Sequence, residues 1–280
     1  MARASTALGD EWVLWESVTD ANAEVPGASY DAASVLRPVA AFATAEDMWR
    51  VWHSFPLPSM LFTDGETRGK LARAGAAGET FVTVLALFRR GLRPDWTHAP
   101  SLDGGQIRFR GKLSSKFLDS VWKSSILAAC GEMLEPAVED GDDPVDGRPS
   151  AGEADGQVPL VAGVRVVDRC GPGVRRFAVE LWLTSGPEGD QVLEKDMRAA
   201  LKRAPASPLG RVGSVAARWK VAMADGLTAS GVTTRAGKPA FVSDLMYRPH
   251  AQSRAREAVL SGAGPALEAS RLASQEAGTA

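Results

Sequence analysis

Residues 84–111 read VLALFRRGLRPDWTHAPSLDGGQIRFRG, and this stretch decides the fold. The apolar residues at its start predict a buried strand, and the alternation of apolar and basic side chains over 107–110 predicts a second one. The basic connection between them turns at Asp95 and places Trp96 in a loop. Loops lie on the surface and often carry function, and a large aromatic residue exposed there indicates that a ligand covers it. The main functional question is therefore what binds Trp96.

The rest of the chain alternates pairs of predicted strands with single predicted helices. Helices are predicted at 44–55, 114–131 and 188–203, and a loop is predicted at 63–79. Besides the two strands above, strands are predicted at 11–15, 35–42, 160–167, 177–183, 214–223 and 241–242. Strand pairs joined by single helices are typical of an antiparallel sheet with helices on one face. The predicted fold class is therefore α+β.

Two apolar residues stand off the core-facing stripes of the first two predicted helices. Thr44 is a good N-cap for the first helix, whose core face begins at Met48; Trp49 lies on the shoulder of that face beside Ala45. In the second helix Leu127 points away from the core, next to Lys123. Both residues are compatible with wide core packing or with a shared outer surface that binds a partner.

Composition predicts one domain with appendages. The predicted parts are a flexible N-terminus at 1–10, a domain at 11–246 and a low-complexity tail at 247–280. The segment 135–157 is acidic and rich in Gly and Pro, which predicts a disordered insertion. This segment carries a charge of −7. Because the net charge of the whole chain is −2, the remainder carries +5 and is mildly basic. That balance suits a short anionic ligand better than a long nucleic-acid track.

The sequence does not support most classes of enzyme, metal-binding protein or membrane protein. It contains no phosphate-binding loop, no serine-hydrolase elbow and no zinc-protease motif. Two cysteines and three scattered histidines offer neither a disulfide framework nor metal-ligand spacing, and no stretch is apolar enough to span a membrane. We expect no cofactor, no metal, no membrane partner and no enzymatic activity. An enzyme whose active site these motifs do not reveal ranks as the third hypothesis, behind two hypotheses that invoke binding.

A ligand-binding interpretation finds more support. Trp96 and Trp182 could supply stacking platforms at the ends of strands, and Arg169, Arg175 and Arg176 around one turn could hold phosphates. The alternative is that Trp182 belongs to the core and that these arginines are merely solvated.

The spacing of tryptophans favours the binding interpretation, because the chain resembles the mRNA cap-binding initiation factor 4E family. The resemblance runs from 11 to 242 and includes WVLW at 12–15, MWRVWHSF at 48–55 and RPDW at 93–96. Further segments in family order are 119–132, 163–169, 181–182 and 228–234. The family fold is a curved antiparallel sheet with three helices on its convex face.

The resemblance implies a site for 7-methylguanosine on the concave side of the sheet. Trp96 and Tyr30 would sandwich the base, and Trp182 would contact its methyl group. The family's glutamate for the guanine edge is replaced by Thr97, with Asp95 or Asp103 as substitutes. The phosphates would be held by Arg169, Arg175 and Arg176.

The resemblance also implies a partner-binding surface on the dorsal helices. Trp49 and Leu127 match two of its anchors, with Ala45 alongside, whereas Lys123 replaces an apolar anchor and Ser124 an acidic one. The expected partners are capped mRNA and an initiation factor 4G-like or 4E-binding protein, in the cytoplasm. The second hypothesis is a 4E-like scaffold with weak cap binding that acts through its dorsal face.

Overall fold

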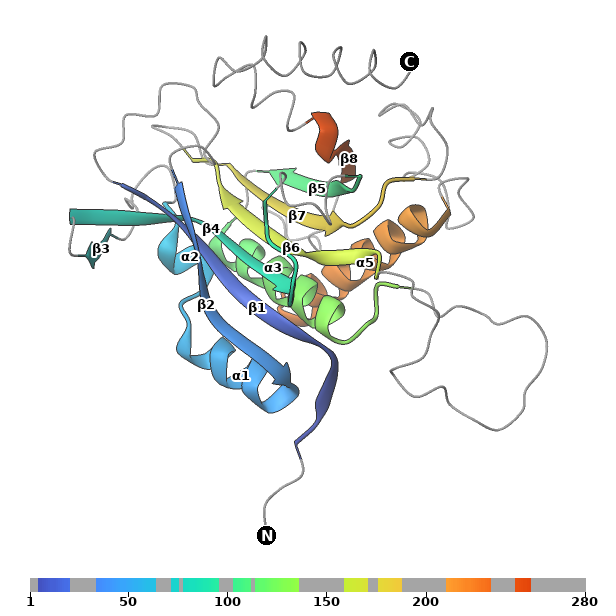
Figure 1. Cartoon of the computed structure of the whole chain (residues 1–280), viewed down its shortest axis with the longest axis horizontal. Coiled ribbons are helices and arrows are strands. Elements are labelled where there is room, and N and C mark those ends of the chain that lie inside the picture. The colour runs from blue at the N-terminus through green and yellow to red at the C-terminus, as the bar shows by residue number, and fades with distance from the viewer. Residues whose placement is uncertain are drawn as a thin grey trace, which may run out of the picture.

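A computed structural model describes most of the predicted domain (Figure 1). The described residues are 5–20, 34–63, 72–75, 78–95, 103–111, 114–135, 159–170, 176–187, 210–232 and 245–252. Of the predictions above, the helix at 188–203 and the strand at 241–242 lie outside these residues.

The described strands form one curved sheet in which every neighbouring pair is antiparallel. They are β1 (Ala7–Asp20), β2 (Ser34–Thr44), β3 (Ala72–Gly75), β4 (Gly78–Arg89), β5 (Gly105–Gly111), β6 (Val161–Asp168), β7 (Phe177–Leu183) and β8 (Leu245–Pro249). Their order is β2-β1-β4-β6-β7-β5-β8, and β3 pairs with β4. The predicted α+β class is confirmed.

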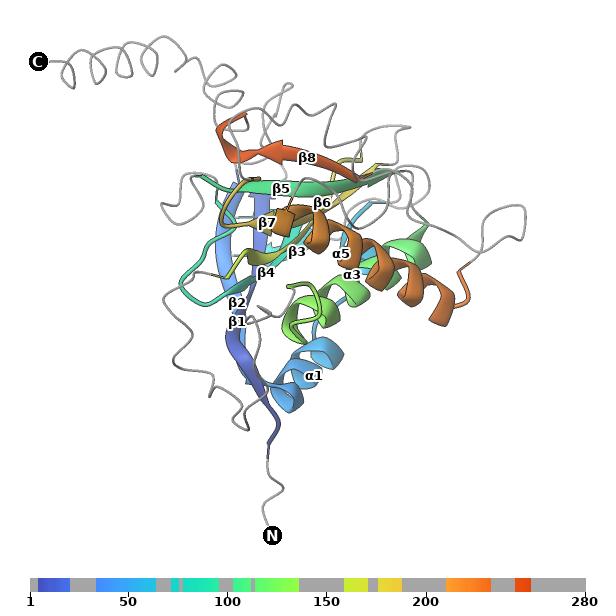
Figure 2. The ribbon, with the colours of Figure 1, turned by 90° about the vertical axis from the view of Figure 1, so that its right-hand side faces the viewer.

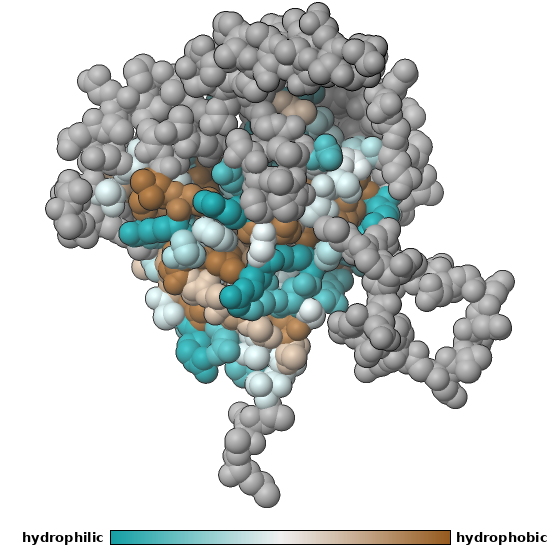
Figure 3. Space-filling model, viewed as in Figure 1, coloured by the Kyte–Doolittle hydropathy of each residue, from teal (hydrophilic) through white to brown (hydrophobic). Residues whose placement is uncertain are grey.

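The helices lie on one side of this sheet, which Figure 2 shows edge-on. They are α1 (Ala45–Ser54), the short α2 (Pro58–Leu61), α3 (Ser115–Cys130) and α5 (Gly210–Ala229). The opposite face carries none of these four helices and is called the helix-free face below. It is turned toward the viewer in Figures 1 and 3, and Figure 3 shows hydrophobic and hydrophilic residues interspersed on it.

Local sequence signals set the first residues of α1 and α3. The side chain of Thr44 accepts a hydrogen bond from the Asp47 amide, and the side chain of Ser114 accepts one from the Phe117 amide. Each bond satisfies an amide that the first turn of a helix leaves without an intrahelical partner. The predicted N-cap Thr44 is therefore confirmed, and Ser114, where the second helix was predicted to begin, is the N-cap of α3.

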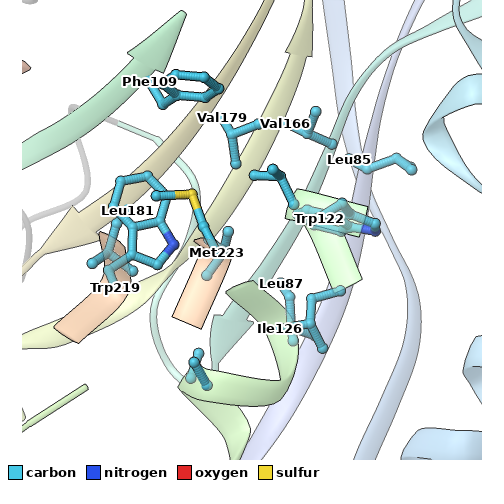
Figure 4. Close-up of a cluster of buried hydrophobic side chains, with 14 of the residues drawn as sticks. Leu85, Leu87, Phe109, Trp122, Ile126, Val166, Val179, Leu181, Trp219 and Met223 are labelled. Atoms are coloured by element: carbon cyan, nitrogen blue, oxygen red, sulfur yellow. The ribbon is translucent and has the colours of Figure 1, made fainter. Parts of the chain in front are cut away.

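The main core lies between the sheet and the helices. Figure 4 shows Trp122 and Ile126 from α3 and Trp219 and Met223 from α5, packed with alternate residues of the strands such as Val166. The two helices are also joined by a buried hydrogen bond from Trp219 Nε1 to Ser125 Oγ at 2.8 Å. Gly226 of α5 lies so close to Ser124 of α3 that an added Cβ would overlap the serine hydroxyl.

The predicted strand at 214–223 is wrong, because these residues belong to α5. Its buried residues recur at intervals of three and four, which is the period of a helix and not of a strand. They are Val212, Val215, Ala216, Trp219, Met223 and Leu227.

Other element bounds differ from the prediction. The loop at 63–79 contains the short β3, and the sheet extends beyond the predicted bounds 11–246, since β1 begins at Ala7 and β8 ends at Pro249.

Glu135, the first residue of the acidic segment, is ordered: its carboxylate accepts hydrogen bonds from the amides of Leu160 and Val161 at 2.9 and 3.0 Å. The remainder of that segment, up to 157, lies outside the described residues.

Candidate functional site

The helix-free face carries a row of side chains that crosses the sheet. Residues paired across neighbouring strands point to the same face, so the register defines the row directly. In sheet order it contains Trp15, Ala86, Arg165, Glu180, Arg108 and Met246. Glu180 of β7 therefore has an arginine on each of its two neighbouring strands.

Glu180 is the centre of a buried charge cluster, which we define as Glu180, Arg108, Arg165 and Arg169. Arg165 Nε donates to Glu180 Oε2 at 2.8 Å, and Arg108 Nη2 lies 2.6 Å from Oε1. Arg169 Nη2 is further away, 3.8 Å from Oε1. The Gln106 amide, oriented so that both of its polar atoms have partners, donates to Oε2 at 3.0 Å.

The cluster keeps Glu180 ionised although its side chain is 0% exposed. Burial alone would raise the pKa of this carboxyl, but the guanidinium groups of Arg165, Arg108 and Arg169 outweigh burial and lower the pKa well below its ordinary value. The cluster is therefore a set of three cations around one permanent anion, with a net charge of +2 among these four side chains.

Trp182 lies on the helix-free face, and its ring is enclosed. The side chain is 0% exposed. The Phe88 ring contacts it edge-on at 5.4 Å, Arg165 Cζ lies 4.7 Å from its centroid and the His250 ring lies 4.5 Å away. Its Nε1 points to Glu180 Oε2 at 3.4 Å. Contact between Trp182 and a ligand would require these neighbours, His250 in particular, to move.

A missing side chain at Gly163 makes room for this arrangement. Gly163 pairs with Phe88 on one side and with Trp182 on the other. A Cβ at Gly163 would overlap the Phe88 ring and the Leu87 carbonyl oxygen. The glycine thus allows the Phe88 and Trp182 rings to meet across β6.

Of the other predicted site residues, Arg169, Arg176 and Asp95 are among those that the structure describes. Arg169 and Arg176 flank the β6–β7 turn, where the Arg169 amide donates to the Arg176 carbonyl oxygen at 3.0 Å. Asp95 is half-buried and ends the described part of the β4–β5 connection. Trp96, Thr97, Tyr30 and Arg175 lie outside the described residues.

The segment that leads to Trp96 is anchored on the same face. Leu92 packs against the apolar cluster that contains Trp182, and Arg93 Cζ lies 5.8 Å from the Trp15 ring centroid. The start of the β4–β5 connection therefore lies beside Trp182, near the end of β7, whereas the β6–β7 connection lies at the opposite end of these strands.

Sequence analysis missed Glu180, Arg165, Arg108 and His250. Glu180 and Arg165 are charged residues inside strands of mostly apolar residues, and that local signal was available, whereas Arg108 is one of the basic residues that alternate with apolar ones in β5. What could not be predicted was the register that places them opposite one another.

The dorsal residues lie on the other side of the sheet. Trp49 is 37% exposed, its ring stacks on His53 at 6.0 Å, and Lys123 Nζ lies 5.6 Å from its centroid. Leu127 is half-buried and packs against the main core, and Ala45 lies one turn before Trp49. Trp49 and Lys123 therefore form one surface across α1 and α3, which we call the dorsal surface.

The described residues contain no other candidate site of the classes considered above. Among them, no group of His, Cys, Asp and Glu could hold a metal ion, and no helix is long and apolar enough to cross a membrane. Cys130 and Cys170 are both buried, and they form no disulfide bond with each other. Burial raises the pKa of the Cys130 thiol to about 12, so this thiol is unsuited to nucleophilic chemistry.

Comparison with known proteins points to one family. The model of the family described as Eukaryotic initiation factor 4E matches residues 7–147. Eukaryotic translation initiation factor 4E-2 of Schizosaccharomyces pombe is 25% identical over 129 residues, which cover 46% of this chain and 43% of that protein. The 4E-1 protein of the same organism is 36% identical over 130 residues, covering 46% and 49%.

The chain spans about half the length of these curated relatives that it matches. Among solved structures, a complex of C. elegans eIF4E-3 with the 4E-binding protein Mextli and cap analog aligns with a TM-score of 0.49 and 17% identity. That alignment covers 90% of this chain and 96% of the other.

Proposed function

The chain belongs to the eukaryotic initiation factor 4E family, and from this premise we propose that its helix-free face binds the 7-methylguanosine cap of mRNA. We propose that it does so in the cytoplasm, without an enzymatic step, in translation initiation or its regulation. The proposed contacts are Trp96 and Tyr30 stacked on the base, Thr97 or Asp95 at the guanine edge, Trp182 at the methyl group, and Arg169, Arg175 and Arg176 at the phosphates.

One observation carries this proposal: an aromatic group and a cation share one region of the helix-free face. Trp182 and Arg169 both approach Glu180, and Leu92, which precedes Trp96, packs against the cluster of Trp182. A stacked base gains about 1–3 kcal/mol. The positive charge of a 7-methylated base adds about 0.5–2 kcal/mol of attraction to the ring face.

We expect 7-methyl-GTP to quench the intrinsic tryptophan fluorescence at concentrations at least about tenfold lower than GTP, since only the methylated base carries the charge that the rings attract. Trp96→Ala and Tyr30→Ala should each weaken binding of 7-methyl-GTP by about tenfold or more, because each removes one stacking partner. Titrations of the wild-type chain and of both variants measure this.

The matched control for this titration is Trp49→Ala, which also removes one tryptophan but on the dorsal side of the sheet. It should leave the dissociation constant for 7-methyl-GTP unchanged. Equal and weak quenching by 7-methyl-GTP and GTP would contradict cap binding. That result would favour the scaffold hypothesis, which the enclosure of Trp182 by Phe88, Arg165 and His250 supports.

We further propose that the dorsal surface binds an initiation factor 4G-like or 4E-binding protein. Trp49→Ala should weaken binding of a helical peptide with the pattern Tyr-x-x-x-x-Leu-Φ by about thirtyfold, because a half-exposed tryptophan is a typical interface hot spot of about 2 kcal/mol. Leu127→Ala should act in the same direction. Isothermal titration calorimetry with the peptide measures both.

Val221→Ala is the control for the dorsal surface, since Val221 is an exposed apolar residue on α5. It should leave peptide affinity unchanged. If Trp49→Ala and Leu127→Ala bind the peptide as tightly as the wild-type chain, the dorsal surface is not its binding site.

A further inference from the structure

The dorsal surface contains a positive charge that lies directly over its exposed aromatic ring. Lys123 of α3 is exposed, and its Nζ lies 5.6 Å from the centroid of the Trp49 ring on α1. The two helices lie on the same side of the sheet (Figure 2). Among the residues that the structure describes, no acidic side chain forms an ion pair with Lys123. Its contact is the attraction between an ammonium group and the face of an indole ring.

The acidic residues of α1 and α3 are held by other groups. Asp119 lies one turn before Lys123, at a spacing that suits an ion pair within a helix. Its carboxylate accepts hydrogen bonds from the amide of Ser59, at 3.0 Å, and from the hydroxyl of the same residue. Glu46 and Asp47 have partners at the start of α1. Within the described part of the chain, Lys123 is therefore available to an anion from another molecule.

A partner that covers Trp49 also covers the ammonium group of Lys123, because this group lies over the ring. An apolar group packed there would take the charge out of water without a counter-ion, which is unfavourable. If Lys123 swung its long side chain into solvent instead, it would lose the contact with Trp49. A carboxylate at the same place keeps this contact and pairs with the charge.

We propose that Lys123 selects the partner of the dorsal surface: a helical peptide that places an acidic residue against Lys123, beside the apolar residue that covers Trp49. On the peptide helix these two residues lie three or four positions apart. The inference rests on the proposed binding of a partner to the dorsal surface, and it defines the chemistry of that partner. A basic peptide residue at the same position is repelled, so Lys123 supplies selectivity as well as affinity.

The surroundings of Lys123 strengthen such an ion pair. Leu127, one turn after Lys123 on α3, is half-buried and packs against the main core. Lys123 therefore adjoins an apolar residue along its own helix and the Trp49 ring across to α1. A bound peptide that covers both apolar groups shields the pair from water. Charges attract one another more strongly in that environment than in open solvent.

The test uses the Tyr-x-x-x-x-Leu-Φ peptide in versions that differ at one x position. That position carries Glu, Gln or Lys, the other three carry Ala, and the four x positions are tested in turn. Isothermal titration calorimetry with the full chain gives the dissociation constants. For at least one position, we expect the wild-type chain to bind the Glu version at least about tenfold more tightly than the Lys version, with the Gln version between them.

Two substitutions of Lys123 assign this preference to its charge. In Lys123→Glu the order of the three versions should reverse, and in Lys123→Leu the three dissociation constants should agree within about twofold. Arg218→Glu changes the net charge as much as Lys123→Glu does, at an exposed position on α5, and should keep the wild-type order and ratio. Circular dichroism confirms that each variant is folded.

The preference should also depend on salt. The Debye length falls from about 10 Å at 0.1 M salt to about 3 Å at 1 M, so that exposed and partly covered charges are screened. We expect the ratio between the Glu and Lys versions to fall at least about threefold over this range, whereas the affinity of the Gln version should change by less than about twofold. A ratio that is independent of salt would overturn the role of the Lys123 charge.

The failure of this inference differs from failure of the proposed dorsal binding. If all versions bind the wild-type chain but Glu and Lys are equivalent at every position, or if the preference for Glu persists in Lys123→Leu, the selective role of Lys123 is refuted and dorsal binding stands. If no version binds the wild-type chain, both proposals are overturned.

Discussion

Trp219→Ala is expected to lower the free energy of unfolding by about 3–5 kcal/mol. Trp219 is fully buried between α5, α3 and the sheet, so its removal leaves a large cavity. The variant also loses the buried hydrogen bond from Trp219 Nε1 to Ser125 Oγ. Ser125 keeps its own hydrogen bond to the Val121 carbonyl oxygen, so the cavity accounts for most of the effect.

Urea unfolding followed by far-ultraviolet circular dichroism measures this loss, since it does not depend on tryptophan emission. Val221→Ala in the same helix is the control, because Val221 is exposed and its truncation should change stability by less than about 0.5 kcal/mol. A loss below about 1 kcal/mol in Trp219→Ala would mean that α5 contributes little to the core, contrary to its packing in Figure 4.

Glu135→Ala is expected to lower the free energy of unfolding by a similar amount, about 3–5 kcal/mol. The Glu135 carboxylate contacts Arg89 Nη2 at 3.1 Å and Arg211 Nη2 at 3.4 Å, and it accepts from the amides of Leu160 and Val161. Arg89 is itself buried, so the substitution removes one of its two carboxylate partners, the other being Asp10. One side chain thus connects the end of α3 to the start of β6, to β4 and to α5.

The same unfolding measurement applies, with Asp225→Ala as the control for loss of one acidic residue at an exposed position on α5. Glu135→Gln should fall between the wild-type chain and Glu135→Ala, because an amide keeps an acceptor for the backbone but not the charge for Arg89. If Glu135→Ala is as stable as Asp225→Ala, the carboxylate has no structural role.

Features encoded within a few residues were the most predictable. The N-cap Thr44 and the buried stripe of α3 follow from residue type and helical period, and both were confirmed. The alternation in β5 also depends only on neighbouring residues, and it was predicted correctly. The acidic composition of 135–157 predicted disorder for Glu135 as well. A single carboxylate at the edge of such a segment can still contact a buried partner, as Glu135 contacts Arg89.

The prediction for α5 failed for a different reason. A strand was predicted over 214–223, whereas Val215 and Met223 lie on the same helical stripe as Trp219. A window longer than the ten residues considered would have shown the helical period.

The candidate site was the least predictable part of the molecule. Arg169 and Trp182 were candidates from residue type alone, before the family resemblance implied a role for each, and both approach Glu180. The role of Glu180 itself depends on β6, β7 and β5 being neighbours in a fixed register, which no local pattern specifies. The stacking roles of Trp96 and Tyr30 remain predictions.

The order of strands in the sheet has a consequence for the nascent chain. β5 (Gly105–Gly111) pairs with β7 and β8, both of which follow it in the sequence, and the last of these pairings reaches Pro249. During synthesis β5 therefore has no partner until β7 leaves the ribosome, and one of its edges stays open until β8 does. Such a high contact order favours slow folding and exposes an unpaired strand edge meanwhile. We expect the half of the sheet that carries the charge cluster to form late in synthesis, after β1, β2 and β4 have already paired.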